Sequence, residues 1–278
     1  MSDLRSKVQK PKKNRIKNAF IILILILLYV WGFAGINFSG ISPNAGTVTS
    51  AILDGFLNPE WSYIYRPGQE DLIQNLLETF AIALVGITLS IVLSFPIAFW
   101  AARNLSVKRI ISGSGKSFLS FFRTFPDIVM ALIFIAIVGP SPYAGMLALG
   151  VSAMGMLGKL YAEEIEAIDP GPSEALVAAG ANKLQVLLFA VVPQVLPGFI
   201  SATLYRFEIN LRSAATLGIV GAGGIGAPLI FAINGRSWDR VAIILIGLVV
   251  FVLVIDLISS ALRKKSNLMK RSATGNIP

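Results

Sequence analysis

Charged side chains within one strongly apolar run are the first candidates for chemistry in this sequence. Arg206, Glu208 and Arg212 lie there, and an ionised group inside a membrane is costly unless it is paired or reached by water. Glu208 and Arg212 are spaced to neutralise each other on a helix, whereas Arg206, Asn210 and Ser213 form a second polar stripe. Ionisable side chains inside a membrane often mark the path of a transported solute. These five residues are therefore candidates for a translocation pathway, with a structural salt bridge as the open alternative.

A polar stretch, 162–193, separates two apolar runs and has the signals of a short helix. The sequence Pro170-Gly171-Pro172 breaks the preceding helix, and Ser173 is predicted to cap the next one. Glu174 would then lie in the first turn, where the helix dipole favours a carboxylate. Gly180 is predicted to end or bend this helix.

Two glycine-rich segments resemble nucleotide-binding motifs by letter only. The segment 113–117 ends like a phosphate-binding loop, but Ile110 stands at the position of the first required glycine. The segment 221–226 follows an apolar run and lacks the strand context of a dinucleotide site. We expect this chain to bind no ATP, Mg or other cofactor. The second segment is predicted to form either a tight re-entrant turn at an exterior gate or a plain connecting loop, through Gly221, Gly223, Gly224 and Gly226.

The composition indicates a membrane protein. Of 278 residues, 55% are hydrophobic and 14% are charged, and the mean hydropathy is +0.73. The chain contains no Cys and no His, which excludes disulfides, thiolate or imidazole metal ligands and the usual proton relay. The net charge of +9 comes mostly from tails and loops that border apolar runs, so it suits membrane topology better than nucleic-acid binding.

Six apolar runs approach the length that a membrane-spanning helix needs. Lys and Arg gather in the segments before the first run, after the second, after the fourth and after the last, whereas the alternate segments hold only Arg66, Arg236 and Arg240. This asymmetry predicts that both termini are cytoplasmic. The predicted spans are 19–37, 77–100, 118–138, 144–161, 195–218 and 240–262.

The same runs divide the chain into segments. The first run is predicted to be a retained anchor, with a cleaved signal peptide as the alternative, because its basic leader is long and no Ala-x-Ala-like cleavage site follows it. An interfacial helix is expected near Thr47–Leu57. The predicted order is a basic tail over 1–18, the first span over 19–37, an exterior connection over 38–75, a five-helix domain over 76–262 with a cytoplasmic loop over 162–193, and a second basic tail over 263–278.

Two further patterns concern packing. Arg123 and Asp127 are four residues apart and are predicted to form a structural pair. Ala144, Ala148 and Ser152 recur every four residues, which allows close helix approach either inside the chain or at a subunit interface.

The segment Glu174-Ala175-Leu176 with Gly180 and Pro193 resembles the EAA signature of permease subunits in ATP-binding-cassette (ABC) importers. Its tail departs from the family's Ile-x-Leu-Pro, reading Ala190-Val191-Val192-Pro193. The flanks and the stretch 205–226 resemble phosphonate-transport permeases.

The resemblance implies an all-α integral membrane protein of the type I ABC importer (MetI-like) architecture, located in a bacterial inner or plasma membrane. Glu174, Ala175, Gly180 and Pro193 would belong to a helix-turn-helix that docks on the ATPase. Implied partners are two ATPase subunits that bind ATP and Mg, an exterior phosphonate-binding protein, and a second permease copy or close relative. Alternatives are import of phosphite or another phosphorus oxyanion, or an ion-coupled secondary transporter, which would need membrane carboxylates such as Asp127 or Glu208.

Overall fold

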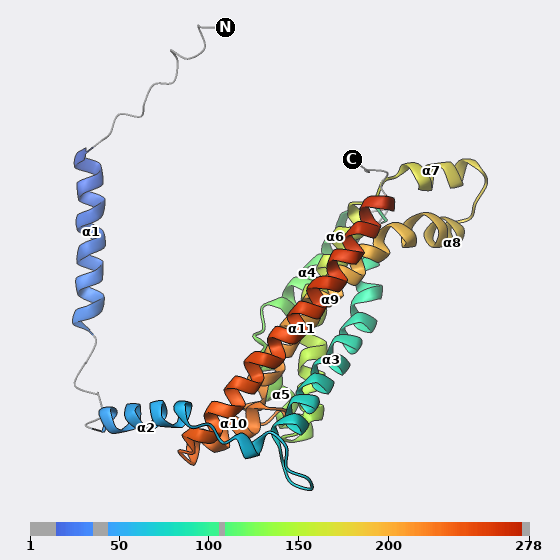
Figure 1. The fold of residues 1–278 in the computed structure, drawn as a ribbon. Coiled ribbons are helices and arrows are strands. Elements are labelled where there is room, and N and C mark those ends of the chain that lie inside the picture. The colour runs from blue at the N-terminus through green and yellow to red at the C-terminus, as the bar shows by residue number, and fades with distance from the viewer. Residues whose placement is uncertain (1–14, 36–43, 106–108, 274–278) are drawn as a thin grey trace, which may run out of the picture. The chain divides into compact units, whose positions relative to one another are not determined.

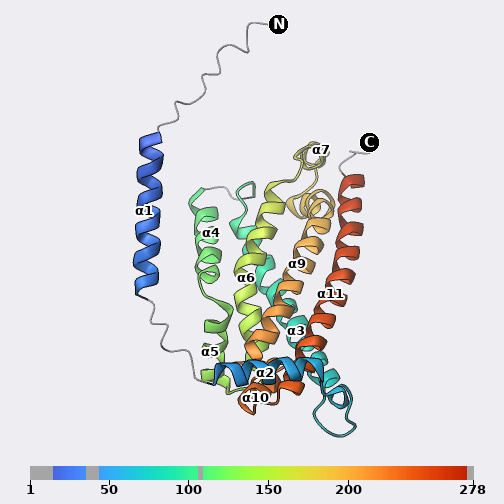
Figure 2. The ribbon, with the colours of Figure 1, turned by 60° about the vertical axis from the view of Figure 1, so that its left-hand side comes forward.

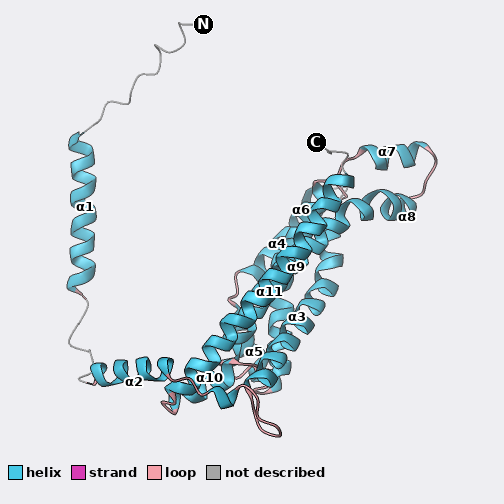
Figure 3. Ribbon diagram, viewed as in Figure 1, coloured by secondary structure: helices cyan, strands magenta, loops and turns pink. Residues whose placement is uncertain are grey.

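The computed structural model describes residues 15–35, 44–105 and 109–273, and within them it contains helices and no strands (Figure 3). The chain divides into two compact units, 1–50 and 51–278. The helices are α1 (Arg15–Ala34), α2 (Ala45–Leu57), a 3-10 turn (Trp61–Tyr63), α3 (Leu72–Ala101), α4 (Arg109–Arg123), α5 (Asp127–Val138), α6 (Pro142–Glu166), α7 (Gly171–Ala178), α8 (Lys183–Val186), a π-helical turn (Leu187–Val191), α9 (Val192–Gly218), α10 (Gly226–Asn234) and α11 (Trp238–Ala273).

In the second unit, α3, α6, α9 and α11 run side by side (Figures 1 and 2). The helices α7 and α8 lie at one end of this bundle, and α10 lies at the other (Figure 1). Polar side chains begin two of the long helices, since Asp71 Oδ1 accepts a hydrogen bond of 2.7 Å from the Gln74 N–H and Ser141 Oγ accepts one from the Ala144 N–H. The all-α fold is therefore as predicted.

Small residues let α3 and α6 pack closely. Gly150 faces Leu89, and a Cβ at Gly86 would lie 2.9 Å from the Leu149 side chain. Ser90 donates a hydrogen bond of 2.8 Å from its hydroxyl to the Gly150 carbonyl on the neighbouring helix. Ala144, Ala148 and Ser152 are buried within the chain, so the small-residue stripe serves internal packing.

Five helical segments among the described residues have the length and composition to cross a membrane. They are Lys17–Ala34, Leu72–Ala101, Pro142–Glu166, Lys183–Gly218 and Trp238–Lys264. The first lies in the N-terminal unit. Part of the predicted first span, 36–37, lies outside the described residues.

The predicted third span, 118–138, is not one continuous helix. It is interrupted between α4 and α5, whose axes differ in direction by 81°. Pro126 causes the break, because its ring disfavours helical backbone in the preceding residue and it has no N–H to donate. Its own backbone is extended, with φ −60° and ψ 144°. If this bent pair forms one span, the described residues contain six.

The helix that follows the polar loop is irregular at another proline. Pro193 cannot donate the N–H that would bond to the carbonyl four residues earlier, and a π-helical turn over Leu187–Val191 immediately precedes it. Such turns often mark functional positions in long helices. The short helix expected near Thr47–Leu57 is present as Ala45–Leu57, and Gly55 packs against Trp238 at the start of α11.

Candidate functional site

The polar loop predicted over 162–193 forms two short helices joined by a tight turn. Glu174 lies in the first turn of α7, as predicted. Ser173 does not cap this helix, because α7 already begins at Gly171, and the buried Ser173 hydroxyl has no hydrogen-bond partner among the described residues. Instead, the Gly171 N–H donates to Asp169 Oδ1 at 3.0 Å. The serine prediction was wrong because the helix starts at Gly171, three residues before the start at Glu174 that a cap at Ser173 would give.

Gly180 ends α7 in the left-handed conformation, with φ +85°. The Ala181 N–H donates to the Leu176 carbonyl at 2.9 Å, and the Gly180 N–H donates to the Val177 carbonyl at 3.0 Å. This pair of bonds is the Schellman motif, which satisfies the last carbonyls of a helix and favours glycine. Asn182 then caps α8 through a reciprocal pair of hydrogen bonds with Gln185.

Hydrogen bonds tie the base of this loop to the bundle. The Asp169 N–H donates to Gln194 Oε1 at 3.0 Å, and Gln194 Nε2 donates back to the Asp169 carbonyl. Glu166 accepts hydrogen bonds from Lys116 Nζ at 2.7 Å and from the Arg103 N–H at 2.8 Å. The two helices project from one end of the bundle (Figure 1) and expose Glu174, Ala175, Val177 and Leu184. The π-helical turn that follows them exposes Phe189. Pro193 lies at the start of α9, at the foot of this element.

The charged residues of α9 meet partners from other helices. Asp127 at the start of α5 accepts hydrogen bonds from Ser152 and from Ser213, the latter at 2.6 Å, and it lies 3.6 Å from Arg206. The predicted pairing of Asp127 with Arg123 is therefore replaced by pairing with Arg206. The bend at Pro126 places Arg123 and Asp127 on separate helices, so helical spacing no longer applies to them.

Glu208 joins two arginines, one of which the sequence pattern missed. Its pairing with Arg212 is as predicted, with 2.8 Å between Arg212 Nη2 and Glu208 Oε1. The other oxygen, Oε2, lies 3.0 Å from Arg263 Nη2 on α11. The sequence places Arg263 at the start of the predicted basic tail. Its position at the edge of an apolar run is the one sequence signal for a contact inside the bundle.

A cavity of about 340 Å³ opens beside this part of α9. Of the five predicted pathway residues, the structure places Arg212 and Ser213 at its wall, together with Asp127, Ile209 and Thr216. Arg206, Glu208 and Asn210 are buried and do not line it. Neither amide atom of Asn210 has a hydrogen-bond partner in the described part of the chain.

The glycine-rich segment forms a buried tight turn at the end of the bundle that carries α10. Gly221, Gly223 and Gly224 have φ values of +92°, +80° and +72°, which glycine adopts without strain. The Gly224 N–H donates to Glu78 Oε1 at 3.0 Å, and the Ile225 N–H donates to Thr79 Oγ1 at 2.8 Å. A Cβ at Gly226 would lie 2.7 Å from Ile219 N. These contacts favour the tight turn over the plain connecting loop.

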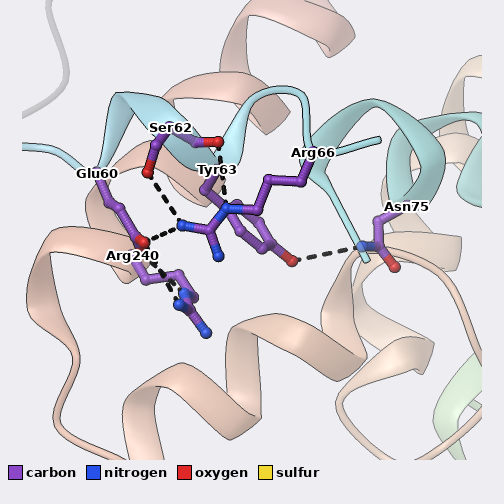
Figure 4. A network of polar contacts seen from close by, with 6 residues as sticks. All are labelled: Glu60, Ser62, Tyr63, Arg66, Asn75 and Arg240. Carbon is purple, nitrogen blue, oxygen red and sulfur yellow. Dashed lines mark hydrogen bonds and ion pairs between the residues drawn. The ribbon is translucent and has the colours of Figure 1, made fainter. Parts of the chain in front are cut away.

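A second charged network, which the sequence did not indicate, lies at the start of α11 (Figure 4). Glu60 pairs with Arg66 and with Arg240, the latter at 2.9 Å from Nε to Oε2. Both guanidinium groups lie over the Tyr63 ring, at 5.5 and 5.1 Å from its centre. The hydrogen bond from Arg240 lowers the pKa of Glu60 from its ordinary 4.5, and burial raises the pKa of Tyr63 to about 12.

Among the described residues, no group of three or more carboxylates is placed to hold a metal ion.

Comparison with known proteins adds the family. The family described as "Binding-protein-dependent transport system inner membrane component" matches residues 94–267, more than half of the chain. The phosphite transport system permease protein PtxC of Stutzerimonas stutzeri is 41% identical over 197 residues, which cover 71% of this chain and 72% of that protein. The putative cryptic phosphonate transport system permease protein PhnE2 of Escherichia coli is 49% identical over 119 residues, covering 43% of this chain and 98% of that protein.

Solved structures confirm the fold. An inward-facing MetNI methionine ABC transporter matches with a TM-score of 0.60 at 22% sequence identity, covering 70% of this chain and 95% of the matched chain. The expected MetI-like architecture is thus present in the described residues. The family match, the similar permeases and this architecture together show that the chain belongs to the binding-protein-dependent transport system inner membrane components, the permease subunits of ABC importers.

Proposed function

We propose that this permease carries phosphonates inward across a bacterial inner membrane. Similar proteins are named for phosphite and phosphonate transport, so phosphite and related oxyanions are the neighbouring alternatives. The cavity supports an anionic cargo, because the Arg212 side chain at its wall is 54% exposed and a guanidinium pairs well with phosphorus oxyanions.

The energy would come from a separate ATPase. The family implies an ATPase and a substrate-binding protein as partners, and the element α7–α8 is the surface we assign to the ATPase. It is tied to the bundle by Glu166 and Asp169. It exposes Val177 and Leu184, and the adjoining π-helical turn exposes Phe189, as a docking surface requires. Two ATPase subunits, holding ATP and Mg, would bind one such element on each of two permease chains.

The remaining assignments follow from this arrangement. Both termini and α7–α8 would be cytoplasmic, and the exterior binding protein would deliver substrate at the end that carries α10. The turn with Gly221, Gly223, Gly224 and Gly226 would form the gate at that end, held by Glu78 and Thr79.

The test is uptake of labelled methylphosphonate by proteoliposomes that contain this chain, its ATPase and its binding protein. We expect uptake only when ATP is supplied on the ATPase side, with phosphite as a weaker competitor. Uptake driven by an ion gradient without ATP would instead support a secondary transporter, and preference for phosphite over methylphosphonate would change the assigned cargo.

A further inference from the structure

Glu208 has two cationic partners that differ in how firmly they are held. Arg212 and Arg263 each contact a different oxygen of the carboxylate, at 2.8 and 3.0 Å. The Glu208 side chain is only 9% exposed, so removal of both partners would leave a charge in a nearly dry environment, which is strongly unfavourable. One partner could leave without that penalty, because the other would remain.

Arg263 is the firmly held partner. Its guanidinium also donates to Ser260 Oγ at 3.3 Å, lies 3.9 Å from Asp256 Oδ1, and covers the Tyr205 ring at 5.9 Å from the ring centre. Its side chain is 23% exposed. These contacts hold it against α9 whether or not Arg212 is present.

Arg212 is the loosely held partner. Its side chain is more than half exposed, and Glu208 supplies its ion pair. It lines the cavity of about 340 Å³ beside Ser213 and Thr216. An anion that enters this cavity therefore meets a guanidinium with free donor positions, since a single carboxylate oxygen does not satisfy its five N–H groups.

The carboxylate of Asp127, which also lines the cavity, does not cancel this attraction. It accepts hydrogen bonds from Ser152 and Ser213 and lies 3.6 Å from Arg206, so these partners largely compensate its negative charge. Asp256 lies beside Arg263 and offsets the positive charge there. Of the two guanidinium groups on Glu208, Arg212 is the more accessible, with 54% of its side chain exposed against 23% for Arg263.

We infer that Arg212 is the residue that contacts the phosphorus oxyanion during passage, and that Glu208 is its displaceable counter-ion. When the oxyanion binds, Glu208 gives up Arg212 and stays neutralised by Arg263. When the oxyanion leaves, Glu208 takes Arg212 back. The competition weakens binding and so permits release, which a carrier needs. This inference rests on the proposed function, because it names the substrate contact of the same pathway.

The test is equilibrium binding of labelled methylphosphonate, phosphite and phosphate to the full-length chain in nanodiscs with its ATPase. Glu208→Gln removes the competitor and should tighten binding by roughly tenfold, the scale of one lost charge-assisted contact. Arg263→Gln leaves Glu208 dependent on Arg212 and should weaken binding. Arg212→Gln should abolish it, and Arg212→Lys should restore part of it.

If Glu208, Arg212 and Arg263 serve only to stabilise the fold, the three glutamine variants should all lower thermal stability. Glu208→Gln should then weaken binding or leave it unchanged. Either result for Glu208→Gln, or normal binding by Arg212→Gln, would overturn the inference. Thermal unfolding of each variant identifies loss of fold, and Arg212→Lys keeps the charge if Arg212→Gln fails to fold. The affinities of the variants are measured separately from uptake. If ATP-driven methylphosphonate uptake occurs but the variants do not rank in affinity as expected, only this inference is rejected. If the variants rank in affinity as expected but methylphosphonate is not taken up, only the proposed cargo is rejected.

Discussion

Asp127, the first residue of α5, accepts a hydrogen bond from Ser213 of α9, with 2.6 Å between the two oxygen atoms. The two residues are 86 positions apart in the sequence. Their contact joins the break at Pro126 to the helix that carries Arg206, Glu208 and Arg212. The bend and the charged part of α9 therefore form one polar cluster. A substitution at the bend should change the ion pairs of α9, and a substitution in α9 should change the contacts of the bend.

Replacement of Asp127 by alanine should destabilise the chain through Arg206. Breaking a buried ion pair costs about 3–5 kcal/mol when one charge is left alone, and we expect the lower end because a quarter of the Asp127 side chain is exposed. Thermal unfolding in detergent measures the loss. The double variant Asp127→Ala/Arg206→Met should lose less than the sum of the single changes, and strict additivity would show that the pair does not act as a unit.

Replacement of Gly180 should impair coupling without disturbing the bundle. An added Cβ meets no atom within 4 Å, so the cost comes from the positive φ, about 1–2 kcal/mol for a residue other than glycine. ATP-driven uptake should fall in the order wild type, Gly180→Asn, Gly180→Ala, Gly180→Leu, because asparagine tolerates this conformation best. Gly180→Leu should abolish uptake yet remain inserted. Wild-type uptake by this variant would contradict the assigned role of α7–α8 in docking.

Features with local causes could be predicted from the sequence. The end of α7 at Gly180, the place of Glu174 in its first turn and the Glu208–Arg212 pair all depend on neighbours within a few residues. Apolar runs likewise located the long helices, because their length and composition suffice. Ser173 shows where local reasoning fails, since Asp169 and the two prolines start the helix before the expected cap.

Features that depend on distant residues could not be predicted. Arg263 reaches Glu208 across 55 positions, and Arg240 reaches Glu60 across 180. The continuous span expected over 118–138 ignored the effect of Pro126 on its neighbours, and the Asp127–Arg206 pair follows from that break. The cavity beside Arg212 arises from the packing of α5 against α9, which no single segment specifies.

Substitution of Gly226 by alanine should damage the tight turn near α10. The new Cβ would lie 2.7 Å from Ile219 N and closer still to the Ala215 carbonyl oxygen. Backbone atoms cannot rotate away, so we expect a loss at or above the upper end of the usual overpacking cost of about 1–3 kcal/mol. Thermal unfolding measures it. Gly113→Ala is the matched control, because nothing lies within 4 Å of its added Cβ and α4 should tolerate alanine. Equal stability of the two variants would disprove the close approach of α9 and α10.

Glu60→Gln should weaken the contact between the 3-10 turn and the start of α11 in a pH-dependent way. The Arg240 hydrogen bond lowers the pKa of Glu60 below 4.5 in the folded chain, so the unfolded chain binds the proton more readily. The ionised carboxylate therefore contributes stability above that ordinary pKa, and the contribution is lost as the pH falls through the folded value. We expect about 1 kcal/mol at neutral pH, because Arg66 and Arg240 are partly exposed.

The measurement is the unfolding midpoint of wild type and Glu60→Gln in detergent between about pH 7 and pH 3.5. The difference between them should be constant near neutrality and should shrink on acidification, since the wild-type carboxylate then becomes neutral like the amide. Glu163→Gln is the control, because its ion pair with Lys159 is about half exposed and should change the midpoint little at any pH. If the difference in unfolding midpoint between wild type and Glu60→Gln is the same at the lowest pH, the charge of the carboxylate does not stabilise the start of α11. The shape of the side chain would then account for the contact.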